Sequence, residues 1–344
     1  MANNNDKKVL NVPALRFPEF TEEWKKCTIK DYGEVITGNT PPTKNIEYYS
    51  NGSYLWASPA DLGLSKHITS TKTKLSLLGL KKTRTIPQGS ILVTCIGSTI
   101  GKMGMATETM STNQQINSVI VNDSTNNDFA YYAILNAFPR YLSEVGVQAV
   151  PILSKSNFEK LPNHTTTKEE QRKLGYFLNL LDERIATQNK IIEDLKKLKS
   201  AITDLLFHSI ADAHTIRLGK IAHITNGAGD VQDANTEHQE DWYPFFDRSE
   251  ELKWFPTYSF DKEAVIYAGE GQSFYPRYYN GKFALHQRCY AITDFASCII
   301  PKYCYHFMNT LNSYFVRNSV GSTVPSLRMD IFQKVEIRLP PISK

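Results

Sequence analysis

The chain has 344 residues, of which 41% are hydrophobic and 22% charged, and its formal net charge is +4. This length exceeds one ordinary core and suits two domains of about 150 residues. No apolar run approaches the ~18–20 residues of a membrane span, and the polar start of the chain lacks the apolar segment of a signal peptide. The five cysteines form no C-x-x-C pair, which argues against a zinc module or disulfide scaffold and indicates reduced thiols in a cytoplasm.

The first part of the chain predicts short strands and turns with one helix. Val12–Phe20 is punctuated by prolines and is expected to lie extended on this domain. Residues 90–96 and 115–121 are apolar runs typical of strands, and the glycines that follow the first run indicate a tight turn. Residues 127–135 begin with an acidic turn and place apolar residues at helical spacing, which predicts a helix.

A basic segment lies within this first domain. Residues 62–107 contain no aspartate or glutamate and hold seven cations: Lys66, Lys72, Lys74, Lys81, Lys82, Arg84 and Lys102. Such a segment creates a positive local field that attracts the phosphates of nucleic acid with a salt-dependent affinity. A solvated basic loop is the alternative that the sequence leaves open.

A long helix is predicted for residues 167–207. It begins after three threonines followed by glutamates, the usual chemistry of a helix start. Apolar residues then follow the alternating four- and three-residue steps of a coiled-coil seam, with polar Gln188 at one position and a local break at its last third. The seam consists of Leu174, Leu178, Leu181, Ile185, Ile192, Leu195, Leu198, Ile202 and Leu205. A helix of about 41 residues is ~60 Å long, and its exposed seam is expected to need a partner helix. One arm of an intramolecular bundle is the alternative.

The remainder of the chain repeats the first part. The motif Ile29–Gly38 reappears as Leu218–Gly227, and the motif Val150–Phe158 reappears as Val324–Phe332. Residues 264–268 are then the counterpart of the first buried strand. Two related units on a helical spacer suit contact with two places on a long repetitive ligand, for which DNA is the obvious candidate.

The order of domain, heptad helix and related domain resembles the DNA-specificity subunits of type I restriction–modification systems. The motifs that carry the resemblance are Val12–Trp24, the spacer segments Glu169–Leu174, Leu181–Ile185, Leu195–Lys199 and Leu205–Phe207, and the recognition-domain pieces Gly97–Gly101 and Asn113–Gln114. The resemblance covers essentially the whole chain. It implies a mixed α/β fold of two target-recognition domains joined by a long coiled-coil-type helix.

The resemblance also implies a non-catalytic function. Each domain would bind one half of a split sequence in double-stranded DNA, and the helix would act as the ruler between the halves. No cofactor is implied for this chain itself. S-adenosylmethionine is expected on the methyltransferase (modification) subunits that would bind it, with restriction subunits outside them.

The chain departs from the family pattern at its carboxyl end. By the repeat register, a second spacer helix would begin near Leu339, where only a short tail remains. The seam of the first helix is therefore expected to be open. It would be covered by a methyltransferase subunit, by self-association of two chains, or by a separately made helical fragment, and the sequence does not rank the three.

Candidate DNA contacts follow from side-chain chemistry. Lys72, Lys74, Lys81, Lys82, Arg84 and Lys102 suit phosphates; Asn113, Gln114, Gln287 and Arg288 suit base edges; Arg277 and Lys282, with Tyr275 and Tyr278, combine charge with aromatic faces. The pairs Asn113–Gln114 and His286–Gln287 recur at one register of the repeat. A structural or partner-contact role is therefore the alternative for these two pairs.

No catalytic, cofactor-binding or metal-binding residue is predicted. Gly97–Lys102 has the wrong spacing for a phosphate-binding loop. Asn39–Thr43 lacks the aromatic residue of an adenine-methylase loop and is interpreted as a turn. The histidines are scattered along the chain.

The sequence thus predicts target-recognition domains at residues 1–165 and 211–344 and a spacer helix at 166–210. The predicted protein is a cytoplasmic, non-enzymatic subunit that places methyltransferase and restriction subunits on a two-part DNA site. A helical adaptor or inhibitor that binds methyltransferase subunits without productive DNA recognition is the alternative function.

Overall fold

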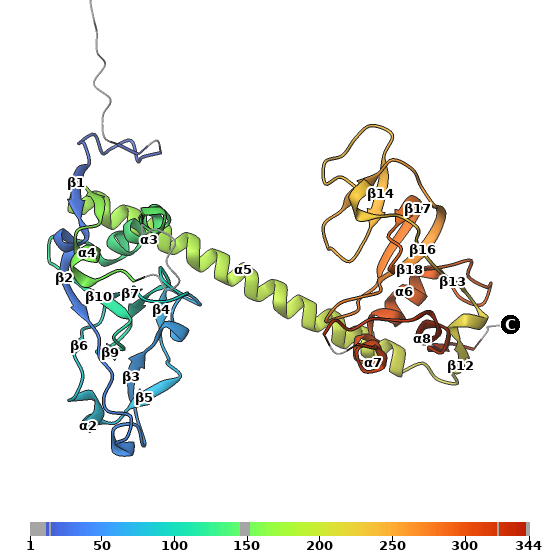
Figure 1. The fold of residues 1–344 in the computed structure, drawn as a ribbon, viewed down its shortest axis with the longest axis horizontal. Coiled ribbons are helices and arrows are strands. Elements are labelled where there is room, and N and C mark those ends of the chain that lie inside the picture. The colour runs from blue at the N-terminus through green and yellow to red at the C-terminus, as the bar shows by residue number, and fades with distance from the viewer. Residues whose placement is uncertain (1–11, 14, 145–151, 322, 342–344) are drawn as a thin grey trace, which may run out of the picture. The chain divides into compact units, whose positions relative to one another are not determined.

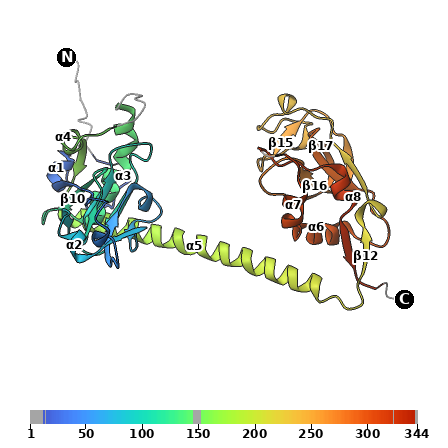
Figure 2. The same cartoon turned by 60° about the horizontal axis from the view of Figure 1, so that its bottom comes forward.

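A computed structural model describes residues 12–13, 15–144, 152–321 and 323–341 of the chain. The chain divides into two compact units, residues 1–188 and 189–344, so each unit includes one half of the long helix α5 (Lys168–His208). Both units mix helices and strands, which confirms the predicted fold class (Figures 1 and 2). Among the described helices, none combines the length and the apolar character that crossing a membrane requires.

The described strands of unit 1 form sheets of antiparallel or mixed pairing. The strand orders are β1-β11, β2-β10-β7-β8-β4 and β5-β3-β9-β6. The strands are β1 (Lys25–Thr28), β2 (Gly33–Thr37), β3 (Tyr54–Ala57), β4 (His67–Ile68), β5 (Thr73–Leu75), β6 (Thr85–Ile86), β7 (Ile91–Thr94), β8 (Met103–Ala106), β9 (Met110–Thr112), β10 (Ile116–Val121) and β11 (Pro162–Thr165). The predicted strands at 90–96 and 115–121 are thereby confirmed as β7 and β10.

Helices and 3-10 turns connect the strands of unit 1. They are α1 (Ile29–Tyr32), α2 (Leu77–Leu80), α3 (Asn127–Glu144) and α4 (Lys155–Glu159), with the 3-10 turns η1 (Ile46–Tyr48) and η2 (Pro59–Asp61). Helix α3 covers the central sheet because its buried residues Ala130, Ile134 and Phe138 recur every four residues and join the core around β7. Helix α2 and strands β3, β5, β6 and β9 form the end of unit 1 that lies away from α5 (Figure 1).

Unit 2 repeats this plan with fewer strands among its described residues. Its sheets are β12-β19 and β13-β18-β16-β17-β14-β15. The elements are β12 (His214–Arg217), β13 (His223–Asn226), β14 (Tyr243–Phe246), β15 (Lys253–Phe255), β16 (Phe260–Ala268), β17 (Arg277–Leu285), β18 (Cys289–Thr293), β19 (Glu336–Leu339), α6 (Pro301–Asn309), α7 (Asn312–Asn318), α8 (Met329–Gln333), η3 (Leu218–Lys220) and η4 (Val231–Asp233).

The pairing of strands supports the predicted duplication. The central order β2-β10-β7-β8 corresponds to β13-β18-β16-β17, and the closing pair β1-β11 corresponds to β12-β19. In unit 1, β3 runs parallel to β9 and antiparallel to β5; in unit 2, β14 runs parallel to β17 and antiparallel to β15. The two units differ in this region, since the single long strand β17 replaces the successive strands β8 and β9.

Gly38 and Gly227, which end the repeated opening motif, occupy the same place in the two units. A Cβ atom at Gly38 would lie 2.3 Å from the carbonyl oxygen of Thr112, and one at Gly227 would lie 2.0 Å from that of Leu285. Thr112 ends β9 and Leu285 ends β17. The glycines therefore permit the loop after β2 to approach the end of β9 closely, and the loop after β13 to approach the end of β17.

Helix α5 begins and ends within one residue of the predicted bounds 167–207. Its start has the predicted chemistry: the hydroxyl of Thr167 accepts a hydrogen bond from the Glu170 N–H at 3.4 Å, and Glu169 and Glu170 lie in the first turn. Forty-one residues at ~1.5 Å each give a helix of ~60 Å.

The amino-terminal segment packs on this first turn of α5 through Arg16. The guanidinium of Arg16 donates two hydrogen bonds of 2.7 Å to the carboxylate of Glu170, whose side chain is fully buried. Burial alone would raise the pKa of Glu170, but hydrogen bonds from Arg16 and Thr166 outweigh it and lower the pKa. A buried carboxylate is tolerated here because its charge is matched and its oxygens are bonded.

Candidate nucleic-acid interface

The end of unit 1 that carries β3, β5 and α2 holds five of the predicted cations, Lys72, Lys74, Lys81, Lys82 and Arg84, and we call residues 72–84 the basic loop. The side chains of Lys72, Lys74, Lys81 and Lys82 are exposed. Arg84 is anchored there, since its Nη1 donates to the Thr37 carbonyl and its backbone N–H donates to Asn39 Oδ1, both at 2.8 Å. These contacts hold the basic loop beside the end of β2.

A concavity of about 390 Å³ lies next to this basic loop, and we call it the unit 1 concavity. It is lined by Thr40, Thr43, Ile46, Tyr49, Trp56 and Thr73. The hydroxyl of Thr40 donates to Gln114 Oε1 at 2.5 Å, which places the predicted Gln114 beside the lining. Ile46 is 75% exposed. The lining is therefore made of hydroxyl, aromatic and aliphatic groups, without a formal charge.

A second concavity, of about 530 Å³, lies in unit 2, and we call it the unit 2 concavity. It is lined by Val231, Asp247, Arg248, Ser249, Lys253, Glu270, His286, Gln287 and Arg288. Lys253 pairs with buried Asp247 at 2.7 Å, and Arg288 pairs with Glu270 at 2.7 Å. In contrast to the unit 1 concavity, this lining is charged.

The two concavities share part of their framework in the repeat. Across β3 and β5, Trp56 pairs with Thr73, and across β14 and β15, Phe245 pairs with Lys253. Thr73 and Lys253 each line the concavity of their unit. The loops after β2 and β13 supply the opposite wall through Thr40 and Val231. A shared framework thus carries different side chains in the two units.

Some predicted contacts are used inside the protein. Asn113 is 8% exposed, and its side chain bonds to the backbone N–H and the side chain of Gln115, which favours the structural alternative for this residue. Lys66 of the basic segment pairs with Asp128 at 2.7 Å. Lys102 is exposed but lies against Gly63 at the β7–β8 turn, apart from the basic loop.

The predicted residues of unit 2 fall into two groups. Gln287 and Arg288 line the unit 2 concavity. The other four lie on or just before β17: Arg277 donates to the Ser249 carbonyl, Tyr278 bonds to Glu263, Lys282 lies 4.7 Å from the Tyr258 ring centre, and Tyr275 is exposed. The hydrogen bond to Glu263 raises the pKa of Tyr278 to about 12.

Arg248 is a residue of this site that the motifs did not single out. It stands alone after an aromatic strand and before Glu250 and Glu251, so neither a basic run nor a motif marks it. The repeat register that aligns Gly38 with Gly227 places Arg248 opposite Pro59 in the turn after β3, but it does not show that Arg248 is available to a ligand. Among the described residues, no group of three or more metal-ligating side chains is present.

A family model described as the type I restriction modification DNA specificity domain matches residues 21–197 and, a second time, residues 211–344. Together the two matches cover most of the chain. The chain belongs to this DNA specificity family.

Relatives in the specificity family match about half of the chain. The type I restriction enzyme MjaIX specificity subunit of Methanocaldococcus jannaschii is 30% identical over 183 residues, 52% of this chain and 42% of that protein. The HindI specificity subunit of Haemophilus influenzae is 30% identical over 185 residues, 51% of this chain and 39% of that protein. The matched part of the chain thus spans less than half the length of these relatives.

Solved structures extend the likeness to the fold of nearly the whole chain. The S subunit of a type I restriction–modification system from M. genitalium has a TM-score of 0.64 at 17% identity, over 92% of this chain and 85% of that one. A chain from a structure of type I system assembly and conformational transition has a TM-score of 0.51 at 15% identity, over 93% and 86%. The architecture of two specificity domains and a long helix is therefore shared with S subunits.

The apolar seam of this specificity-family chain is exposed over most of α5. The exposed fractions lie between 40% and 68% for Leu181, Ile185, Ile192, Leu195, Leu198, Ile202 and Leu205. Leu174 and Leu178 differ, because they pack beside α3 at the start of the helix. Within unit 2 the exposed seam borders a groove of about 730 Å³.

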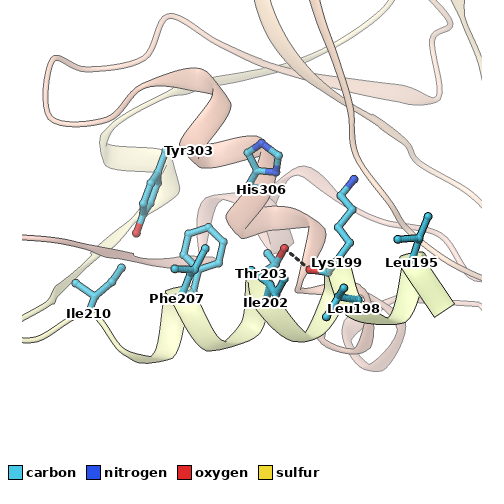
Figure 3. A pocket seen from close by; sticks show the side chains of 10 residues that line it. Leu195, Leu198, Lys199, Ile202, Thr203, Phe207, Ile210, Tyr303 and His306 are labelled. Carbon is cyan, nitrogen blue, oxygen red and sulfur yellow. Dashed lines mark hydrogen bonds between the residues drawn. The ribbon is translucent and has the colours of Figure 1, made fainter.

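Figure 3 shows this groove between the last turns of α5 and helix α6 of the second specificity domain. Leu195, Leu198 and Ile202 come from α5, and Tyr303 and His306 come from α6 (Figure 3). At one end, the ring of Phe207 packs edge-on at 5.2 Å from the rings of both Tyr303 and Phe307. These aromatic contacts fasten the end of α5 to unit 2.

Proposed function

We propose that this chain is the DNA-recognition subunit of a type I restriction–modification system. Its two specificity domains would bind the two halves of a bipartite sequence in double-stranded DNA, and α5 would set the gap between them. The observation that carries the proposal is a shared strand order in which each unit has a concavity beside the loop after β2 or β13, with different linings. Two domains with the same framework and different concavity linings suit a DNA target whose two half-sites differ in sequence.

The exposed lysines of unit 1 support DNA as the ligand. Lysines position a protein on phosphates without reading sequence, whereas amide and guanidinium groups such as those of Gln114, Gln287 and Arg288 read base edges. The basic loop lies beside the unit 1 concavity, so one approach of the duplex would engage both kinds of group. The chain itself would be non-catalytic.

Catalysis would belong to the partners. Methyltransferase subunits carrying S-adenosylmethionine would dock on the assembly, with restriction subunits outside them, in the cytoplasm. The long exposed seam of α5 offers an apolar surface of the kind that such partners cover. Self-association through the same seam is the competing use of this surface.

The test is a methylation map. The chain is co-expressed with its methyltransferase in cells without adenine methylation, and methylated adenines are located across the genome. We expect one two-part motif with a fixed gap. Methyltransferase binding in a pull-down without any motif or DNA footprint would instead favour the helical adaptor.

The phosphate contacts are tested by salt dependence. A fourfold lysine-to-glutamine variant at Lys72, Lys74, Lys81 and Lys82 should lower the slope of log affinity against log salt by up to about 3.6, at ~0.9 per phosphate contact. The control has the same charge change at exposed lysines on other surfaces, Lys25, Lys26, Lys30 and Lys220. Equal slopes in the two variants would refute the basic loop as the phosphate-binding surface.

A further inference from the structure

We propose that Arg248 reads a guanine in the half-site bound by unit 2, and that unit 1 has no equivalent reader. The assignment rests on the proposed function, since it names the base that one of the two concavities contacts. It makes Arg248 a specificity-determining residue.

The charges around the unit 2 concavity leave Arg248 as the unmatched cation. Asp247 is neutralised by Lys253, and Glu270 is neutralised by Arg288. The exposed guanidinium of Arg248 has no hydrogen bond or ion pair within the part of the chain that the structure describes. It therefore keeps its full set of donors for a ligand.

The backbone that carries Arg248 is held on both sides. Asp247 Oδ1 accepts a hydrogen bond of 2.8 Å from the Ser249 N–H, and the Ser249 carbonyl accepts a hydrogen bond from the guanidinium of Arg277. Buried Asp247 is itself fixed by Lys253. The turn that carries Arg248 is thus ordered before DNA binds. Binding would have to order only the Arg248 side chain, which lowers the entropic cost of the contact.

The chemistry of the side chain selects the base. The guanidinium fork matches the O6 and N7 acceptors of guanine in the major groove, which is the commonest specific contact of arginine. Gln287 and the paired Arg288 line the same concavity, so they are placed to contact neighbouring base pairs. Phosphate is the other acceptor that arginine binds, and the test below separates the two.

The first unit cannot make this contact. Ala57 is opposite Thr112 and Phe246 is opposite Leu285 in the parallel strand pairs, so the residue two positions after Ala57 corresponds to Arg248. That residue is Pro59, which has neither a charge nor a donor. The contact proposed for Arg248 is therefore confined to one half of the target.

The experiment uses the chain with its methyltransferase and a random library of bipartite duplexes, selected by binding and sequenced. Wild type is compared with Arg248→Ala, Arg248→Lys and Arg317→Ala, the last being an exposed arginine on α7 outside the concavity. We expect an invariant guanine in one half-site of wild type. Arg248→Ala should lower the discrimination at that position by about 5- to 150-fold. Arg248→Lys should also relax it, because lysine keeps the charge and lacks the fork. The Arg317 variant should retain it.

The outcomes separate the role of Arg248 from DNA recognition by the whole chain. If Arg248→Ala retains the wild-type base preferences, or weakens binding uniformly across all sequences as a phosphate contact would, the inference is overturned while DNA recognition stands. If wild type selects no bipartite sequence, the proposed function fails and the inference fails with it. Arg248 is exposed and makes no hydrogen bond or ion pair in the described part of the folded unit, so thermal melting of the variants should match wild type.

Discussion

Removing one heptad from the middle of α5 is expected to shorten the gap between the two half-sites. Deleting Arg184–Lys190 removes seven residues, or ~10.5 Å of helix at ~1.5 Å per residue. At ~3.4 Å per base pair, this equals about 3 base pairs for a helix parallel to the duplex and fewer for an inclined one. A seven-residue step changes the angular position along the helix by only ~20°, so the deletion shortens α5 with little rotation of one helix end against the other.

The deletion is structurally conservative. Within the described chain, no side chain from Arg184 to Lys190 makes a hydrogen bond, ion pair or ring contact, and the four-three seam stays in phase. The assay is the methylated-adenine map of cells that express the variant with its methyltransferase. A duplication of the same seven residues is the matched control and should lengthen the gap by the same amount. An unchanged gap, with both half-site sequences still methylated, would refute α5 as the ruler.

Three further changes test the fold and the seam. Arg16→Met should lower the free energy of unfolding at pH 7 in urea titrations, since it leaves the buried carboxylate of Glu170 without its cationic partner. Because the pKa of Glu170 is lowered in the folded protein, its carboxylate stabilises the fold above the unfolded pKa of ~4.3, and this stabilisation is lost as pH falls through the folded pKa. The difference in free energy of unfolding between wild type and the Arg16 variant should therefore shrink on acidification. Gly38→Ala and Gly227→Ala should each cost about 1–3 kcal/mol, because the new methyl group meets a carbonyl oxygen of the adjacent strand; an unchanged melting temperature in either variant would contradict the shared role. Leu198→Lys, at a site that is 55% exposed, should leave stability within about 0.5 kcal/mol and weaken association with the methyltransferase or with a second chain in light scattering; unaltered association would argue against the seam as a partner surface.

The parts of the fold that were predictable are those set by local periodicity. The buried run of β7, the heptad spacing of α5 and the helical spacing in α3 each specify an element without knowledge of distant residues. The repeated glycines at positions 38 and 227 likewise marked equivalent turns. Such signals survive in a single sequence because each one depends on a short stretch of chain.

The parts that were not predictable depend on contacts between distant segments. Lys66 belongs to a segment that reads as uniformly basic, yet its ammonium group is captured by Asp128 of α3 and by Asn179 of α5. Arg248 lies in a region without a basic run, yet its neighbours neutralise one another and leave it free. Whether a cation is available to a ligand is set by the acids that folding brings beside it, and sequence spacing does not show this.

The two specificity domains differ in length within one segment of the repeat. The stretch from Gly38 to Phe158 in unit 1 is longer than its counterpart from Gly227 to Phe332 in unit 2. The difference in length falls in one segment. In unit 1, residues 58–90 lie between the end of β3 and the start of β7. In unit 2, the corresponding segment between β14 and the matching position in β16 is only residues 247–264. The longer segment holds most of the basic stretch, and the shorter one holds Arg248. Unit 1 should therefore supply most of the salt-dependent affinity, while unit 2 has to hold its half-site with fewer phosphate contacts and a larger share of contacts to base edges.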